Sequence, residues 1–209
     1  MEESRHLKLN EKKWDKWAET YDGNNWEYKY IRKVQRSVLP LLDIKKNMTF
    51  LDLGCGTGRA VGQVADLVNN KGTFYGVDLS AKMIAKAKVN FKGHKNFHFI
   101  KANAESIPLK NNLFDIIICT NSFHHYYHPD KVMEEIHRLL KSKGKIYILD
   151  PTADSWGLKL ISKLAKFIES DHMKLYSSEE FKSLFINAGL KYVGTQKVQI
   201  AQKVHIGQK

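Results

Sequence analysis

The sequence has few cysteines and no long apolar run, and each shortage excludes a class of protein. Cys55 and Cys119 are the only cysteines among 209 residues, so neither a disulfide framework nor a cysteine metal motif is expected. The longest apolar stretches, such as residues 116–119, are far shorter than the ~20 residues of a membrane-spanning helix. Residues 1–13 are charged and lack the apolar core of a secretory signal. We therefore expect a cytoplasmic protein without stable membrane insertion.

Arginine is also scarce, although the chain is basic. Lysine and arginine total 34 against 22 acidic residues, a net charge of +12, yet only five of the 34 are arginine. Arginine is the residue whose planar fork suits phosphate and guanine contacts. The lysine excess therefore favours a solvated surface over a nucleic-acid interface, and RNA binding is kept as the alternative.

The remaining composition is that of a folded protein. Hydrophobic residues make up 43% and charged residues 27%, near the average for globular chains. A length of 209 residues favours one domain, 1–209. Residues 1–45 contain two predicted helices rich in Trp and Tyr and are interpreted as a helical cap. Residues 46–209 are expected to form the core of the domain, on which this cap lies.

From residue 48 onward, short apolar runs alternate with helical patterns, which is typical of a parallel sheet with crossover helices. Helices are expected at residues 60–68, at 81–91 after a Ser80 cap, from Pro129 to about 140, at 158–168, and after a Ser177–Glu180 capping box. Strands are expected at residues 48–53, 74–77, 97–100, 114–119 and 145–150, with two further β-like runs at 191–198 and 200–206.

A glycine-rich turn, Asp52 to Gly58, follows the first expected strand and indicates a nucleotide-like ligand. Its pattern is G-x-G-x-G, and Arg59 stands where a dinucleotide fingerprint has its third glycine. Asp52 precedes the turn and suits an ammonium group better than a pyrophosphate. Asp78 ends the second strand, where a carboxylate accepts hydrogen bonds from a ribose diol. These residues favour an adenosine with a cationic amino-acid arm.

Several motifs in order now resemble the class I S-adenosylmethionine-dependent methyltransferases, in particular the small-molecule branch that includes quinone-biosynthesis C-methyltransferases. The resemblance covers roughly residues 17–190. It rests on residues 17–22 (WAETYD), 52–58 (DLGCGTG), 76–80 (GVDLS), 103–105 (NAE), 107–109 (IPL), 114–115 (FD), 124–125 (HH) and 135–141 (EIHRLLK).

The resemblance implies a Rossmann-like α/β fold, with a seven-stranded, mostly parallel sheet in the order 3-2-1-4-5-7-6 and helices on both faces. It implies methyl transfer from S-adenosyl-L-methionine to a small-molecule acceptor, with S-adenosyl-L-homocysteine as product and no metal. The alternatives are a tRNA or rRNA methyltransferase and a non-catalytic S-adenosylmethionine-binding regulatory protein. A nicotinamide oxidoreductase is disfavoured by Gly58 and Arg59.

The resemblance also implies roles for individual residues. Asp52 would lie near the amino group of the cofactor, Asp78 would bind the ribose hydroxyls, and Leu79 would pack on the adenine. Asn103 replaces the usual Asp, and its carbonyl oxygen still accepts from the adenine amino group. The full set of expected cofactor-binding residues is Tyr21, Asp52, Gly54, Cys55, Gly56, Gly58, Asp78, Leu79, Met83, Asn103, Ala104, Glu105 and Thr120.

The loop after the fourth strand, residues 120–128, carries the candidate general bases His125 and His124. Imidazole titrates near neutral pH and can deprotonate a hydroxyl. The alternative, which we expect, is that the pair shapes the loop and the cofactor pocket, because positioning alone can promote methyl transfer. Cys119 follows three Ile residues and is expected to be a buried core thiol. No motif identifies the acceptor.

Overall fold

Seven strands form one sheet in the order β3-β2-β1-β4-β5-β7-β6, which confirms the predicted topology. The computed structural model describes residues 2–23, 26–154, 174–199 and 201–209. Strands β1 to β5 pair in parallel, and β7 runs antiparallel to both β5 and β6. The strands are β1 (Met48–Leu53), β2 (Gly72–Asp78), β3 (Phe97–Lys101), β4 (Phe114–Thr120), β5 (Leu140–Pro151), β6 (Lys191–Lys197) and β7 (Gln202–Gln208).

Strand β4 shows how the sequence fills both faces of this sheet. Successive side chains of a strand point to opposite faces. Ile116 and Ile118 accordingly join one apolar cluster, and Ile117 and Cys119 join the other. All four are buried, so the uninterrupted apolar run of β4 is that of a central strand covered on both sides. The expectation that Cys119 is a buried core thiol is confirmed.

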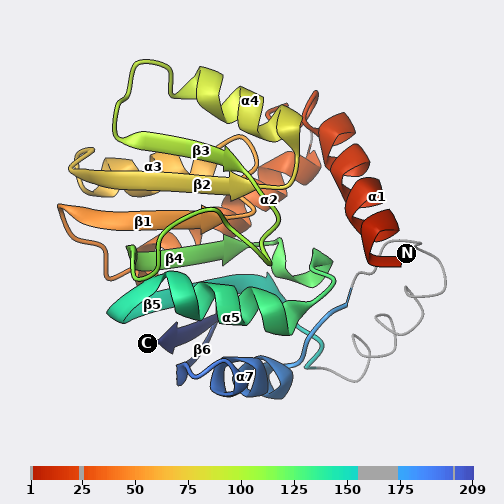
Figure 1. Ribbon diagram of the computed structural model, residues 1–209, viewed down its shortest axis with the longest axis vertical. Coiled ribbons are helices and arrows are strands. Elements are labelled where there is room, and N and C mark those ends of the chain that lie inside the picture. Colours follow the sequence, from red (N-terminus) through yellow and green to blue (C-terminus); the bar gives the residue numbers. More distant parts are fainter. Residues whose placement is uncertain (1, 24–25, 155–173, 200) are drawn as a thin grey trace.

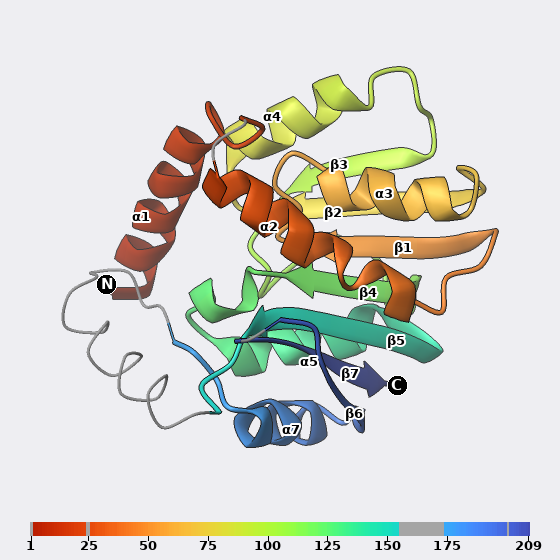
Figure 2. The same cartoon turned by 180° about the vertical axis from the view of Figure 1, so that it is seen from behind.

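Helices cover both faces of the sheet. Helices α2 (Trp26–Arg36), α3 (Arg59–Leu67) and α4 (Ala81–Asn90) supply the first apolar cluster, and α5 (Pro129–Leu139) and α7 (Ser178–Asn187) supply the second. Figure 2 shows α2 and α3 in front of the sheet, and Figure 1 shows α5 and α7 on the opposite side. The predicted Ser80 cap and the Ser177–Glu180 capping box are both present.

Several boundaries differ from the sequence-based expectation, most clearly those of β5 and β7. Strand β5 already begins at Leu140, and its pairing with β4 is irregular until Lys145, with Lys143 in a left-handed conformation at φ 67°. Strand β7 begins at Gln202 and extends to Gln208, because its last residue pairs with Lys145 of β5. The helix predicted at residues 158–168 lies outside the described residues.

The N-terminal residues contribute α1 (Glu2–Trp17), α2 and a short 3-10 turn, Leu39–Leu41. Figures 1 and 2 show α1 standing beyond the ends toward which the parallel strands point, while α2 lies on the sheet itself. In the described part of the chain, no helix combines the length and the apolar character needed to cross a membrane.

Candidate functional site

A pocket lies at the carboxyl ends of the parallel strands, where ligands bind in open α/β sheets. We call it the strand-end pocket. Its walls come from α1, from the turns after β1, β2 and β3, and from the loop after β4. The lining residues are His6, Leu7, Asn10, Trp14, Tyr21, Leu53, Gly54, Gly56, Val77, Asp78, Leu79, Met83, Ala102, Asn103, Ala104, Thr120, Asn121, Ser122, His125 and Tyr126.

The turn after β1 brings backbone rather than side chains to the pocket. Gly54 has φ 78°, which L side chains rarely adopt, and a Cβ there would lie 2.1 Å from the Ser122 Oγ. The N–H groups of Gly54 and Cys55 both donate to the Val77 carbonyl, at 2.8 and 3.0 Å. The turn is therefore fixed to β2, and its open side faces the pocket.

Several residues of the same turn and of the start of α3 do not line the pocket. Gly58 is the N-terminal cap of α3, and a Cβ there would lie 2.9 Å from the ring of Phe99, so this glycine permits close packing of the core. Cys55 is buried in the same apolar cluster. Arg59 pairs with Asp22 of the N-terminal segment, and Thr57 donates to the same carboxylate at 3.0 Å. Asp22 thus joins the segment before α2 to the glycine turn.

Asp78, at the end of β2, faces the pocket and holds the turn in place. Its Oδ2 accepts from the Gly56 N–H at 2.8 Å, and its Oδ1 accepts from the Ser80 N–H at 2.9 Å. Burial raises the pKa of this carboxyl, although both backbone hydrogen bonds act in the opposite direction. Each oxygen has a second lone pair, so the carboxylate can also accept from a ligand.

Asp52 lies beneath the pocket, with 1% of its surface exposed. Its Oδ1 has no hydrogen-bond partner among the described residues. Burial, and then the neighbouring charge of Asp78, raise the pKa of Asp52 to about 8. A buried carboxyl without a partner is costly, and a cationic group in the pocket would compensate for it.

The turns after β2 and β3 form another wall. Leu79, Met83, Asn103 and Ala104 all line the pocket. The Asn103 Oδ1 accepts from the Glu105 N–H at 3.1 Å, so this oxygen already has one partner within its own turn. The Glu105 side chain points away from the pocket, where it accepts from the backbone N–H of His128 at 3.3 Å.

The loop after β4 separates the two histidines that the sequence presents as a pair. The His124 Nδ1 lies 2.9 Å from Oδ1 of the fully buried Asp150, and the His124 N–H donates to the other carboxylate oxygen. His124 does not line the pocket, whereas His125 does. Burial, and then the neighbouring His124, lower the pKa of His125 to about 2, so its imidazole is neutral at physiological pH.

The residues that the sequence reasoning missed lie mainly on α1 and after β4. His6, Asn10 and Trp14 are spaced by four residues along α1 and line one wall together. Their spacing within an otherwise charged helix is the signal that could have revealed them. Ser122 and Tyr126, whose hydroxyls are 2.9 Å apart, carry no comparable pattern.

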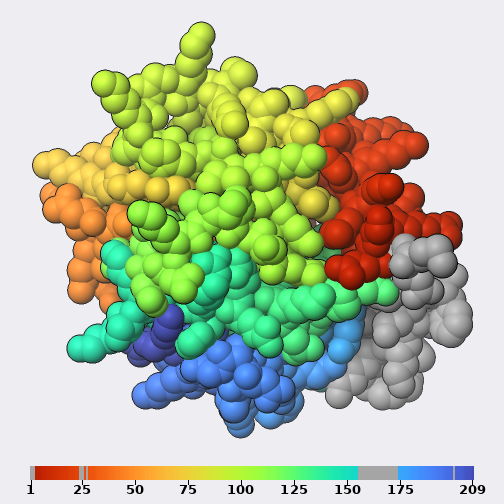
Figure 3. Space-filling view, in the orientation of Figure 1, coloured from red at the N-terminus to blue at the C-terminus, as the bar shows by residue number. Residues whose placement is uncertain are grey.

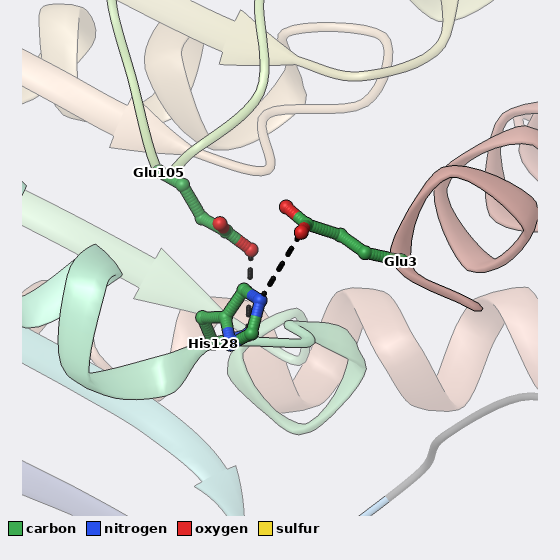
Figure 4. Close-up of side chains that lie close together, drawn as sticks. All are labelled: Glu3, Glu105 and His128. Carbon is green, nitrogen blue, oxygen red and sulfur yellow. Dashed lines mark hydrogen bonds and ion pairs between the residues drawn. The ribbon is translucent and has the colours of Figure 1, made fainter. Parts of the chain in front are cut away.

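Polar contacts along its length hold α1 in this position. Asp15 accepts from the Ser80 hydroxyl, Glu11 pairs with Lys101 of β3, and Glu3 lies 3.4 Å from the His128 Nε2. Figure 4 shows Glu3 and Glu105 on either side of His128, with their ligand-type atoms within 4.8 Å of one another. These groups pair with each other across the α1–α5 boundary, and Figure 3 shows α1 packed against the yellow and green segments.

The charge of the pocket is opposite to that of the whole chain. Its described lining residues include Asp78 but no lysine or arginine, and the buried Asp52 precedes Leu53 and Gly54 of the lining. Unpartnered buried polar atoms also gather here, namely the Asn10 Oδ1, the Asp52 Oδ1 and the Asn121 Nδ2. The donors and acceptors thus fit a ligand that is cationic and polar in one part and neutral elsewhere.

Comparison with known proteins identifies the family. A family model described as a methyltransferase domain matches residues 44–189, more than half of the chain. The chain belongs to this methyltransferase family. The family match and the strand order confirm the resemblance to S-adenosylmethionine-dependent methyltransferases, and with it the expected cofactor.

Individual relatives agree with this assignment. The ubiquinone/menaquinone biosynthesis C-methyltransferase UbiE of Wigglesworthia glossinidia brevipalpis is 30% identical over 141 residues, which cover 61% of this chain and 56% of the relative. The demethylmenaquinone methyltransferase of Lactobacillus johnsonii is 27% identical and covers 88% of this chain and 82% of its own length. A methyltransferase structure from Aquifex aeolicus matches with a TM-score of 0.68 and 25% identity, over 86% of this chain and 97% of its own. The chain spans little more than half the length of the Wigglesworthia relative.

Proposed function

We propose that this chain transfers a methyl group from S-adenosylmethionine to a neutral small molecule of apolar or aromatic character. The observation that carries the proposal is the buried Asp52 carboxyl, whose Oδ1 has no hydrogen-bond partner, under a pocket whose described lining residues include no lysine or arginine. An α-ammonium group would pair with Asp52, whereas the phosphates of a dinucleotide would meet the acidic Asp78 and no lysine or arginine among the described lining residues.

The proposed cofactor contacts follow from the placement of each side chain. Asp52 would hold the ammonium group, and Gly54 and Gly56 would lie against the methionine and ribose parts. Asp78 would accept from the ribose hydroxyls. Tyr21, whose ring would be 3.4 Å from a Cβ at Gly56, would close over the turn. The remaining contacts would come from Leu79, Met83, Asn103, Ala104 and Thr120, which line the pocket.

Methyl transfer requires little covalent chemistry from the protein. When bound, S-adenosylmethionine would supply an electrophilic methyl group whose bond to sulfur breaks as the acceptor atom attacks in line, and a proton carried by that atom would pass to solvent. This chain's own residues align the reactants and exclude water. His125 would serve as a neutral wall of the acceptor site, and His124, held by Asp150, would fix the loop after β4. Neither acts as the general base in this proposal.

The proposal includes one domain, 1–209, in which residues 1–45 act as the cap, because α1 and the strand-end turns line the same pocket. It includes a cytoplasmic location, which two free and buried thiols, Cys55 and Cys119, support. The quinone-biosynthesis relatives support a small acceptor.

RNA methylation is the alternative enzyme, and the net charge of +12 is the feature that favours it. Against it, the strand-end pocket offers no lysine or arginine from the described part of the chain to hold a phosphate near the reacting atoms. Binding of tRNA that weakens steeply with salt would favour this alternative.

Two measurements test the proposal. Calorimetry should detect S-adenosylhomocysteine binding much tighter than NAD binding, and equal or tighter NAD binding would contradict the assignment. A small-molecule extract incubated with methyl-labelled S-adenosylmethionine should yield a labelled neutral product. Cofactor binding with no labelled product from any extract would favour a regulatory protein.

A further inference from the structure

Helix α1 has buried polar side chains on the face that it turns toward the pocket. His6 and Asn10 are 7% and 4% exposed, and the helical repeat places them one turn apart. Both line the strand-end pocket. Polar side chains are rarely buried without a full set of partners, because each unmet hydrogen bond is costly.

The hydrogen bonds of this pair leave one end of an amide unmet. The Asn10 Nδ2 lies 2.7 Å from the His6 Nε2, which itself lies 3.2 Å from the backbone oxygen of His125. The Asn10 Oδ1 is buried and has no partner among the described residues. If the amide were turned round, its NH₂ would be the unmet end. A hydroxyl is the smallest substituent that can complement either end, because it both donates and accepts.

The neighbours of Asn10 assign the unmet end of its amide to the side of the pocket where the methyl acceptor would bind. His6 lies against the backbone of His125, and the ring of Trp14, one turn after Asn10, lies 5.0 Å from the His125 ring in an edge-on arrangement. These contacts are with the loop after β4, not with Leu79, which is proposed to pack on the adenine.

The described pocket wall does not favour an anionic acceptor. The part of the wall that the structure describes has no lysine or arginine, and the His125 imidazole is neutral. An anionic acceptor would therefore lose its hydration without gaining a counter-ion from these residues.

We propose that Asn10 binds a hydroxyl group of a neutral acceptor and thereby selects hydroxylated acceptors over apolar ones of the same shape. His6 is a positioning residue that orients the Asn10 amide. This inference rests on the proposed function, because it assumes that the pocket also holds S-adenosylmethionine.

The test uses three probes of nearly equal shape, 2-naphthol, 2-methylnaphthalene and 2-naphthoate, titrated into the full chain with and without S-adenosylhomocysteine. The wild-type protein should bind 2-naphthol roughly 3- to 10-fold more tightly than 2-methylnaphthalene, as expected for one net hydrogen bond. It should bind 2-naphthoate least. Asn10→Leu, which keeps the approximate size of the side chain, should bind the naphthol and the methyl compound equally.

Controls separate a specific effect from a general loss of structure. Leu9→Ala removes an exposed side chain from the same helix and should keep the wild-type preference. His6→Gln should keep most of the preference and His6→Phe should lose it, because only Gln can still hydrogen-bond to Asn10. Asn10→Ala serves as a second variant if Asn10→Leu does not fold.

Each outcome decides between support and rejection. Equal binding of the two neutral probes to the wild type, or failure of all three to bind, overturns the proposal. An Asn10→Leu protein with weaker S-adenosylhomocysteine binding and an unchanged probe preference also overturns it and assigns Asn10 to the cofactor site. Absence of S-adenosylhomocysteine binding in the wild type contradicts the proposed function instead, and the probe preference is still measured without it.

Discussion

The glycine turn and α1 line the same pocket from opposite sides, yet they are specified in different ways. At the turn, Gly54 has a left-handed backbone, which costs most residues other than glycine, so the site depends on local conformation. On α1, His6 and Asn10 have ordinary helical geometry and reach the pocket only because the whole helix is placed there. A requirement for a particular local backbone conformation can be recognised in the sequence, whereas the placement of a whole helix leaves little signal there.

The sharpest way to test the turn is Gly54→Ala. The left-handed backbone costs an alanine about 1–2 kcal/mol, and overlap with Ser122 adds about 1–3 kcal/mol. Thermal denaturation should show this loss of stability, and calorimetry should show loss of S-adenosylhomocysteine binding. Gly56→Ala is the matched control for the overlap alone, since its backbone is also left-handed at φ 53° but its Cβ would meet nothing closer than 3.4 Å. It should lose less stability than Gly54→Ala, and equal losses of stability would contradict this account of the turn.

Asp78→Ala should come next in size. It removes the acceptor for the Gly56 and Ser80 N–H groups and the proposed acceptor for the ribose hydroxyls. Each charge-assisted hydrogen bond contributes about 1.5–3 kcal/mol, so affinity for S-adenosylhomocysteine should fall roughly 10- to 100-fold. Asp66→Ala, an exposed aspartate on α3, is the control. An unchanged dissociation constant in a folded Asp78→Ala protein would move the ribose site elsewhere.

Asp52 should couple the binding of S-adenosylhomocysteine to the release of a proton. Its pKa of about 8 leaves the free carboxyl protonated at pH 7, and an ammonium partner favours the ionised form. Binding of S-adenosylhomocysteine at pH 7 should therefore release close to one proton, measured by calorimetry in two buffers of different ionisation enthalpy. Asp52→Asn should bind more weakly and release none. Equal proton release by both proteins would reject the pairing.

The same carboxyl should also affect stability. Its pKa is raised from 3.8 to about 8 by folding, so the folded state binds the extra proton between these values. Stability should therefore be fully present below about pH 4 and fall as pH rises toward 8. Asp52→Asn should remove this part of the pH dependence in urea titrations.

The anchoring of α1 should prove weaker than the turn. Glu11→Gln removes the ion pair with Lys101, in which both side chains are partly exposed. Such pairs contribute up to about 1 kcal/mol, so unfolding should change little. Glu3→Gln, which removes the contact with His128, should behave alike. A loss of several kcal/mol from either would mean that α1 is specified as strongly as the turn.

The smallest expected effect concerns His125, which contacts His6 and Trp14 of α1. Its pKa of about 2 predicts no proton uptake by its imidazole between pH 5 and 8. Its NMR signals should stay constant over this range, with other histidine signals as internal references. His125→Phe should keep the shape of the pH–rate profile once an acceptor is found. A limb near neutral pH that disappears in His125→Phe would restore it as a general base.

The elements of the fold were predictable where the pattern was local. The apolar run of β4 and the Ser80 and Ser177 caps each depend on neighbouring residues, and all were found. The extension of β7 to Gln208 was missed because it depends on pairing with β5, a partner distant in sequence.

The same distinction between local pattern and distant contact applies to the candidate site. Gly54 and Asp78 lie where strand ends and a left-handed turn place them, and the sequence predicts both positions. Gly58 belongs to the motif of residues 52–58, but it faces the core. Glu105 belongs to the motif of residues 103–105, but its side chain faces the start of α5. A motif does not specify where each of its side chains points. His124 and His125 look equivalent in the sequence. The structure distinguishes them, because His124 contacts Asp150 on β5.

The sequence alone determined the family, the sheet order that the family implies, and the acid-flanked glycine turn, since these depend on periodicity, backbone conformation and ordered motifs. The tertiary structure decided which polar groups remain without partners and which charges face the pocket. Asn10 on α1 and Asp52 at the end of β1 are far apart in the chain and meet one pocket only after folding. Whether a buried polar group is satisfied depends on every element packed around it, and no local pattern records that.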